Sequence, residues 1–325
     1  MKMSNEKSSC CSSDGCCAGK SITPYNKKDK WIAGEIHTPK GGVPVVSTIL
    51  NLEDTLGAWK VRWGIGRMNY KISPGLYAAG NPDHTSPVLV SANYKLTFDT
   101  LRKELSGLNC WILILDTKGI NVWCAAGKGT FGTDELVSRI SKTGLSGIVS
   151  HRTLILPQLS APGVSAHEVT RQSGFSVVYG PVRARDIKAF LDSGFKATQE
   201  MRTVKFTAWD RLVLTPVELV AAAKTSLMIF GVLFLINLFA ARPFGLADFI
   251  AYAGAVVMGT VVTPVLLPFI PGRAFAWKGW LSGLCWTAGF IWLNGWFASG
   301  SLLLAIGYLL VLPPLSAFLA MNFTG

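Results

Sequence analysis

Residues 121–128 read Asn-Val-Trp-Cys-Ala-Ala-Gly-Lys, and the rest of the chain is organised around this stretch. A single cysteine, Cys124, lies there among small residues, between an apolar run and the start of a helical pattern. Glycine and alanine are typical of places where a ligand approaches the main chain closely. A lone cysteine in such a place is a nucleophile, a metal ligand or a buried core thiol, and the octapeptide by itself leaves all three open.

The composition predicts a membrane part. Half of the 325 residues are hydrophobic and the mean hydropathy is +0.36, which is too apolar for two soluble domains. The formal charge is +12, yet only four basic and two acidic residues lie from Val217 onward, so the basic excess belongs to the part before it. Beside a membrane, such an excess favours an anionic lipid bilayer and an acidic protein partner; we find no motif for nucleic acid.

Residues 1–45 are rich in Ser, Lys, Gly and Pro, which predicts a flexible N-terminal tail. Its adjacent thiols would suit capture of a soft ion such as Hg(II), although their spacing lacks the Cys-x-x-Cys of structural zinc sites. The alternative is a solvated tail without a ligand. These tail cysteines are Cys10, Cys11, Cys16 and Cys17. The other three of the seven are scattered, so the cysteines do not predict a disulfide framework.

Residues 46–202 predict an α/β domain. Strands are expected at 87–91, 111–115, 153–156 and 175–179, and helices at 97–105, 132–142, 165–172 and 183–191. Thr133 is expected to cap the second of these helices. This alternation indicates a doubly wound, mostly parallel, Rossmann-like sheet, in which ligands bind beyond the carboxyl ends of the strands. The loops expected there are 93–95, 124–131, 157–163 and 180–183.

The C-terminal third predicts an all-α transmembrane domain. Residues 203–215, with Lys205, Trp209 and Arg211, are typical of a juxtamembrane linker. Apolar runs at 216–240, 246–270, 277–297 and 301–320 are each near the length of a membrane span, so residues 216–325 are expected to hold four to five spanning helices. Arg273 and Lys278 after the second run favour a cytoplasmic loop. We therefore expect an inner-membrane protein whose soluble domain faces the cytoplasm.

A glycine pattern, GxGxxG at residues 127–132, suggests a dinucleotide site as one alternative, because it follows a strand and precedes a helix. No acidic residue follows at the distance that would hold a ribose. A Walker A loop is excluded, since Val122 stands in place of the first glycine and Gly129 in place of the hydroxyl residue.

The octapeptide, its flanks and the apolar C-terminal third resemble the membrane-bound corrinoid protein of bacterial and archaeal mercury methylation. The soluble part is also similar to the corrinoid domain of the large subunit of the corrinoid iron-sulfur protein of the acetyl-CoA pathway, which lacks a membrane domain. Together these resemblances cover roughly residues 45–325 and imply a cobalamin-type corrinoid, with cobalt, as the cofactor. They imply no iron-sulfur cluster in this chain.

The resemblance implies that Cys124 is the catalytic residue and the lower axial ligand of cobalt. None of the four histidines lies in the Asp-x-His-x-x-Gly motif that supplies a histidine in the usual B12 proteins. A thiolate is a strongly donating ligand, which would favour cobalt(III). Asn121 would brace the loop, and Trp123 would pack beside the cofactor or fill the core. The implied cofactor-binding residues are Asn93, Thr97, Asn121, Val122, Trp123, Cys124, Ala125, Ala126, Gly127, Lys128, Gly129, Pro157, Gly163 and Gly180.

The implied activity is methyl transfer to Hg(II), giving methylmercury. Cobalt(I) would take a methyl cation from a donor linked to methyltetrahydrofolate, and methylcobalt(III) would deliver the methyl with its electron pair, because Hg(II) is itself a cation. A ferredoxin-like iron-sulfur reductase would then return two electrons. The alternative is a membrane-anchored corrinoid methyl carrier of one-carbon metabolism. A metal-efflux protein is a third class, which the lack of charged residues after Lys278 does not favour.

Overall fold

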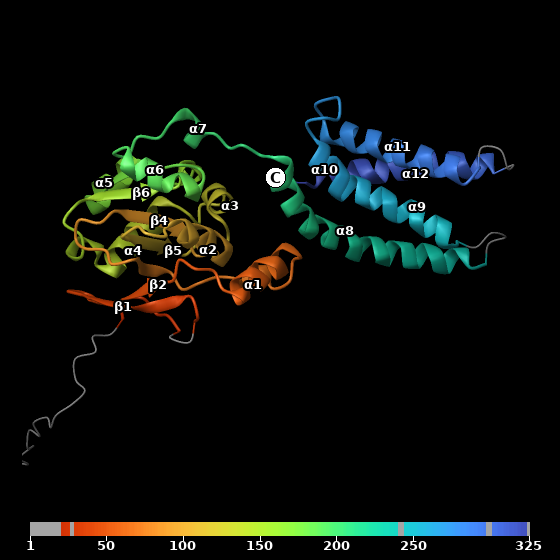
Figure 1. Ribbon diagram of the computed structural model, residues 1–325. Helices are drawn as coiled ribbons and strands as arrows, with labels where there is room; N and C mark the ends of the chain where they lie inside the picture. Colours follow the sequence, from red (N-terminus) through yellow and green to blue (C-terminus); the bar gives the residue numbers. More distant parts are fainter. Residues whose placement is uncertain (1–20, 27–28, 240–243, 297–300, 324–325) are drawn as a thin grey trace, which may run out of the picture. The chain divides into compact units, whose positions relative to one another are not determined.

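The computed structural model describes residues 21–26, 29–239, 244–296 and 301–323 (Figure 1). The chain divides into two compact units. The first contains the residues up to Asp54 together with Met68–Thr203, and the second contains Thr55–Arg67 together with Val204–Gly325. The first unit therefore ends one residue beyond the expected α/β domain, and each unit is described by itself below.

The first unit is built on a mixed sheet in which the described residues form seven strands, ordered β1-β2-β3-β5-β4-β6-β7. Four neighbouring strands, β5, β4, β6 and β7, are parallel, whereas β3 is antiparallel to β5 and β1 forms an antiparallel hairpin with β2. Because β2 is also parallel to β3, four of the six neighbouring strand pairs are parallel, so the sheet is mixed but mostly parallel, as expected. The strands are β1 (Ile32–Thr38), β2 (Gly41–Val46), β3 (Gly75–Ala79), β4 (Val88–Ala92), β5 (Cys110–Leu115), β6 (Thr153–Leu156) and β7 (Ser176–Tyr179).

Helices cover both faces of this sheet, as expected of a doubly wound fold. Successive side chains of a strand point to opposite faces, so the fully buried β5 contributes to two cores. Leu113 and Leu115 pack with α3 (Val122–Gly127), α4 (Thr133–Thr143) and α5 (Ala166–Ser173). Ile112 and Ile114 pack with α2 (Lys95–Glu104) and α6 (Ile187–Asp192) on the other face.

The prediction of a flexible tail over residues 1–45 extends too far, because the last part of this range is folded. Residues 32–46 form β1 and β2, and Thr23 is fully buried. The Thr23 hydroxyl donates to the carbonyl of Leu76 at 2.7 Å and accepts from the Leu76 amide at 2.8 Å, which ties residue 23 to β3. The composition was misleading because β1 is an edge strand whose residues are all half-buried or exposed, and such a strand needs few large apolar residues.

The start of α4 also differs from expectation. Its N-cap residue is Gly132 rather than Thr133, and Gly132 has no side chain to offer. The Thr133 hydroxyl instead accepts a hydrogen bond from the amide of Ser165 at 2.9 Å. Thr133 therefore connects α4 to the loop that precedes α5.

The described residues of the second unit form four long helical segments, close to the four apolar runs of the sequence. They are α8 (Ala208–Asn237), α9 (Leu246–Val257) continuing through a π-helical turn into α10 (Thr263–Leu266), α11 (Phe275–Leu293) and α12 (Leu302–Met321). The expected linker at 203–215 is largely helical. The reason is a capping box, in which Thr207 Oγ1 accepts from the Asp210 amide and the Asp210 carboxylate accepts from the Thr207 amide.

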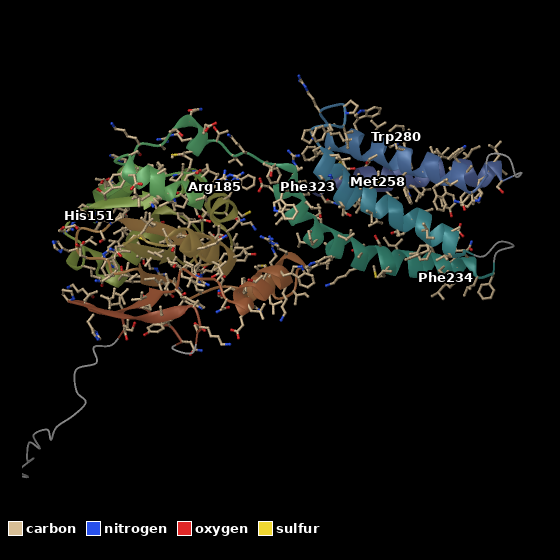
Figure 2. All side chains as sticks on the ribbon, viewed as in Figure 1. His151, Arg185, Phe234, Met258, Trp280 and Phe323 are labelled. Carbon is tan, nitrogen blue, oxygen red and sulfur yellow. The ribbon has the colours of Figure 1, made fainter. Side chains whose placement is uncertain are left out.

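Among the described residues, three of these segments are long and apolar enough to cross a membrane: Ala208–Asn237, Leu246–Leu266 and Leu302–Met321. Apolar side chains project outward along α8, where Phe234 is labelled in Figure 2. The fourth segment, α11, carries Lys278 and four tryptophans, Trp277, Trp280, Trp286 and Trp292, which lower its apolar character. The expected number of four to five spans is therefore supported for three.

Candidate functional site

The carboxyl ends of the four parallel strands meet at one edge of the sheet. β4 ends at Ala92, β5 at Leu115, β6 at Leu156 and β7 at Tyr179. Because these strands are parallel, the segments that follow them are brought to the same edge. Each of the four loops predicted from the sequence follows a different one of these strands. We call this region the carboxyl edge.

Cys124 lies at the carboxyl edge on α3, a helix of six residues rather than the expected loop. The Asn121 side chain caps this helix, since its Oδ1 accepts from the Cys124 amide at 2.9 Å. This is the bracing contact expected of Asn121. Helical spacing puts Val122, Ala125 and Ala126 on the buried side and leaves Trp123 and Cys124 outside.

Trp123 is 54% exposed, so the interpretation of Trp123 as core filling is wrong. Cys124 is exposed as well, which excludes a buried core thiol. An apolar ring and a soft thiol therefore stand next to each other on the outer side of α3. Neighbours of this kind offer a flat apolar surface and one coordinating atom to a ligand.

Asn93 organises the segment between β5 and α3. It is 2% exposed, and its Oδ1 accepts from the Thr117 amide at 3.1 Å, the Thr117 hydroxyl at 2.8 Å and the Gly119 amide at 3.0 Å. Its Nδ2 donates to Asp116 at 3.1 Å. These bonds occupy Oδ1 and one donor of Nδ2, so Asn93 supports the loop, and its expected contact with the cofactor stays a prediction.

The glycines of the site have two different surroundings: Gly163 is closely packed, whereas Gly127 and Gly129 are open. A Cβ on Gly163 would lie 2.3 Å from the Phe131 carbonyl oxygen and 2.9 Å from Ala126 Cα, so Gly163 permits the 157–163 loop to pack against α3 and its following loop. Gly127 and Gly129 have no neighbouring atom within 4 Å of an added Cβ, and they face open space. Gly129 also has a φ of 77°, which glycine adopts without strain.

The remaining predicted residues surround α3 less directly. Thr97 lies in the first turn of α2, which begins at Lys95 and not at Thr97. Pro157 follows β6 and its carbonyl accepts from the Ser160 hydroxyl at 2.8 Å. Gly180 is buried beyond β7 and donates its amide to Leu156 at 2.8 Å. Lys128 is exposed at the end of α3.

Cys110 and Cys124, the two cysteines in the described part of the first unit, differ sharply in exposure. Cys110 begins β5, is fully buried, and burial raises the pKa of its thiol to about 12. Cys124 is exposed and lies on α3, the helix that follows the carboxyl end of β5. The tail cysteines Cys10, Cys11, Cys16 and Cys17 lie outside the described residues. Within the described ranges no group of three or more His, Cys, Asp or Glu side chains is arranged to hold a metal ion.

The histidines do not offer a ligand beside Cys124. His151 Nε2 lies 2.9 Å from the Ser86 carbonyl oxygen, and its Nδ1 accepts from the Thr153 amide, at the amino ends of β4 and β6. His167 has a side chain that is 85% exposed and lies 3.7 Å from Glu168. Both have the structural or solvated roles expected from the sequence.

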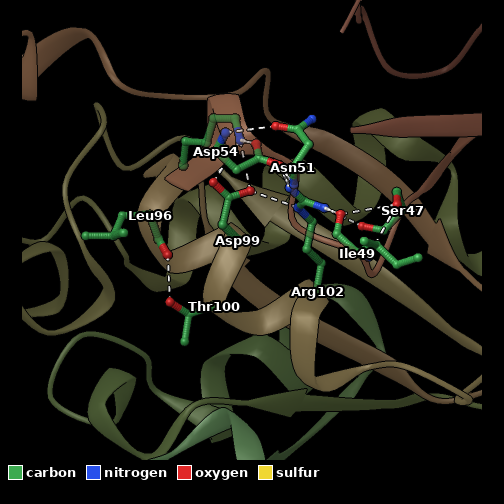
Figure 3. A network of polar contacts seen from close by, with 9 residues as sticks. Ser47, Ile49, Asn51, Asp54, Leu96, Asp99, Thr100 and Arg102 are labelled. Atoms are coloured by element: carbon green, nitrogen blue, oxygen red, sulfur yellow. Dashed lines mark hydrogen bonds and ion pairs between the residues drawn. The ribbon is translucent and has the colours of Figure 1, made fainter. Parts of the chain in front are cut away.

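A charge network joins α1 (Leu52–Arg62) to α2, and sequence reasoning missed it (Figure 3). Arg102 is fully buried; its Nη2 donates to Asp54 at 2.6 Å and its Nε to Asp99 at 2.8 Å. Lys95 donates to the same two carboxylates at 2.7 and 2.8 Å. The i, i+4 spacing of Lys95 and Asp99 and the i, i+3 spacing of Asp99 and Arg102 were the available sequence signals.

This network is fully paired. Burial by itself raises the pKa of Asp54, but the hydrogen bonds from Lys95, Asn51 and Arg102 outweigh that effect and hold the pKa below its usual value. Arg102 Nη1 also donates to the carbonyls of Ser47 and Ile49. Lys95, which stands in a loop expected to face a ligand, is therefore engaged in holding α1.

Comparison with known proteins identifies the class to which the site segment is similar. Residues 66–191 match a family described as the CO dehydrogenase/acetyl-CoA synthase delta subunit. This segment holds every predicted site residue from Asn93 to Gly180, and it holds no part of α8–α12.

Individual relatives are acetyl-CoA decarbonylase/synthase complex gamma subunits. The subunit of Methanocaldococcus jannaschii is 33% identical over 140 residues, which is 42% of this chain and 28% of the relative. That of Archaeoglobus fulgidus is 30% identical over 131 residues, covering 40% and 27%, and a gamma 2 subunit of Methanosarcina thermophila is 41% identical over 90 residues, covering 26% and 19%. The chain thus spans about a quarter of the length of the curated relatives it matches, and none of those named here is named for mercury.

Proposed function

We propose that this chain is a membrane-anchored corrinoid protein that carries a methyl group, with Cys124 as the lower axial ligand of cobalt. One observation carries the proposal: an exposed cysteine on a capped helix at the carboxyl edge, inside residues 66–191, which match the CO dehydrogenase/acetyl-CoA synthase delta subunit family. The methyl-carrier function among the sequence-based alternatives agrees better with these relatives than mercury methylation does.

The residues present fit a corrinoid. A corrinoid brings its own metal and needs one axial donor from the protein, and the exposed Cys124 thiol can supply it. The open space at Gly127 and Gly129 leaves room for a large flat ligand to approach the backbone. The exposed Trp123 ring supplies an apolar surface beside the thiol.

When bound, the corrinoid would accept a methyl group from a donor and release it to an acceptor. In this proposal Cys124 donates electron density, and Asn121 fixes the position of Cys124 by capping α3. Val122, Ala125 and Ala126 hold α3 on the sheet, and Asn93 holds the segment before it. Gly163 allows the neighbouring loop to support α3 from behind.

Electrons and the methyl group must come from partners. A ferredoxin-like iron-sulfur reductase is the proposed electron source, and a donor linked to methyltetrahydrofolate the proposed methyl source. The basic excess before Val217 supports an acidic protein partner, because complementary charge speeds encounter. The three helices of spanning length support a membrane anchor. Arg273 and Lys278 support the cytoplasmic membrane, with the first unit on the cytoplasmic side, as the proposed location.

Hg(II) as the methyl acceptor is a second candidate. The observation that favours it is the combination, in one chain, of the octapeptide at 121–128 with helices apolar enough to span a membrane. The mercury methylation family that the sequence resembles has this combination, whereas the corrinoid iron-sulfur protein lacks the membrane part.

The test uses the full chain in detergent, reconstituted with a methylated corrinoid. Cys124→Ala should change the absorption spectrum toward a water-ligated form and abolish most methyl transfer, while Cys124→His should retain some corrinoid but still transfer poorly. Cys110→Ala is the matched control, because Cys110 lies at the opposite end of β5 and should leave the spectrum unchanged. A wild-type spectrum and wild-type transfer in Cys124→Ala would refute the assignment. Incubation with Hg(II), read as methylmercury, decides between the two acceptors.

A further inference from the structure

Helix α1 exposes an apolar stripe. Leu52, Leu56 and Trp59 follow one another on one side of the helix at intervals of four and three residues, and Trp63, half-buried just beyond the end of α1, continues this spacing. Leu52 is 73% exposed and Trp59 is 59% exposed. Large side chains of this kind normally face a core, so this arrangement is the reverse of a surface helix in water.

The opposite side of α1 is already held by the protein. Val61 is 2% exposed and Asp54 is 5% exposed, and Asp54 is fixed by the buried charge network with Arg102 and Lys95. A rotation of α1 that buried its apolar stripe would break these ion pairs. The helix is therefore fixed with its apolar stripe outward.

The ends of the stripe carry the groups that a membrane surface favours. Trp59 and Trp63 pack against each other with ring centroids 5.8 Å apart, and tryptophan prefers the boundary between water and lipid. Lys60, Arg62 and Arg67 supply positive charge within and just beyond the helix. The nearby acid Glu53 is neutralised by an ion pair with Lys30.

A membrane contact also agrees with the unit to which residues 55–67 belong. Thr55–Arg67 belongs to the same compact unit as α8–α12, and three segments of that unit have spanning length and apolarity. With 11 residues, α1 is about 16 Å long, too short to span a bilayer but long enough to lie in its surface.

We propose that α1 is an interfacial helix, whose Leu52–Trp63 stripe lies in the surface layer of a membrane containing anionic lipids. Its apolar side chains enter the lipid boundary, while Lys60 and Arg67 contact phosphate headgroups. This site needs neither the corrinoid nor Cys124, so it stands independently of the proposed methyl transfer.

The test measures the tryptophan emission of the full chain in nanodiscs of phosphatidylcholine mixed with phosphatidylglycerol. The emission lost in Trp59→Phe/Trp63→Phe reports these two rings among the eleven tryptophans. This difference emission should lose most of its intensity when the lipids are brominated and little when iodide is added to the buffer. Trp123→Phe is the matched control, because Trp123 is similarly exposed on the first unit; its difference emission should respond to iodide and not to bromine.

A charge variant tests the headgroup contact. Lys60→Gln/Arg67→Gln should reduce quenching by brominated lipid in the mixed nanodiscs to the level seen with phosphatidylcholine alone, and Lys103→Gln, an exposed lysine on α2, should not. Quenching of Trp59 and Trp63 by iodide and not by bromine would mean that the stripe faces water. Shielding from both quenchers would mean that a protein covers it. Either result overturns the proposal, and equal quenching with and without phosphatidylglycerol overturns its anionic-lipid part.

Discussion

The first unit contains two polar regions that are built in opposite ways. The charge network of α1 and α2 is buried, and two cations face two carboxylates with every ion pair shorter than 3 Å. The α3 region is held by one side-chain cap and by small residues, and it leaves its thiol exposed. Strong ionic pairing here fixes a helix in place. The side chain available for chemistry, Cys124, lies outside the network of ion pairs.

The largest expected effect is the difference in reactivity between the exposed thiol of the α3 region and the buried thiol of β5. In the corrinoid-free chain, iodoacetamide should modify Cys124 at least about a thousandfold faster than Cys110, because Cys110 reacts only when the sheet opens. Peptide mass spectrometry after timed labelling separates the two sites. Comparable rates would show that α3 is covered or that β5 opens easily.

Removing the central cation of the network should give the largest loss of stability. Arg102→Met leaves two buried carboxylates with Lys95 alone and should destabilise the first unit by about 3–5 kcal/mol. Lys118→Met removes an exposed pair with Asp116 and should change the stability far less. Hydrogen exchange of the β4 and β5 amides measures both; equal effects would mean that the network contributes no more than a surface pair.

Adding one methyl group should have different effects on stability at Gly163, which is closely packed, and at Gly127, which faces open space. Gly163→Ala forces a Cβ against the Phe131 carbonyl and should cost about 1–3 kcal/mol, loosening α3. Gly127→Ala meets no atom within 4 Å and should be neutral or slightly stabilising. Hydrogen exchange of residues 121–131 reports the difference, and protection of α3 that is unchanged in Gly163→Ala would contradict the close packing.

The smallest expected effect is at the helix cap. Asn121→Ala removes the bond to the Cys124 amide and should cost about 1 kcal/mol, seen as faster exchange of that amide. Asn121→Ser keeps a capping oxygen and should restore most of the protection. If serine and alanine behave alike, the cap does not hold α3.

Several parts of the fold could be predicted from the sequence because their signals are local. The buried run 111–115 and the apolar runs after residue 216 depend on neighbouring residues, and both were placed near their observed bounds. β3 was not predicted, since Gly75–Ala79 has five residues and its burial depends on a partner strand 35 residues later. Helix α3 was read as a loop because glycine and tryptophan gave it little helical character, although Asn121 was a usable capping signal.

The candidate site divides in the same way. Cys124 and its neighbours were found from one continuous stretch, and the four loops at the carboxyl edge followed from strand order. Asn93 was expected to contact a ligand, which stays a prediction; its supporting bonds to Thr117 and Gly119 connect segments more than twenty residues apart, which no local pattern reveals. The pairing of Asp54 with Arg102 across 48 residues is invisible for the same reason.

The position of the sheet in the chain has a consequence for synthesis at the ribosome. All seven described strands lie before residue 180, and α8 begins only at Ala208. Every strand can therefore emerge and pair before the first apolar segment is available for insertion into a membrane, since domains fold as units from the N-terminus during translation. Thr55–Arg67 is the exception, because its unit is completed by residues made much later. Asp54 can pair with α2 early, but the segment that follows it must wait for the helices that share its unit.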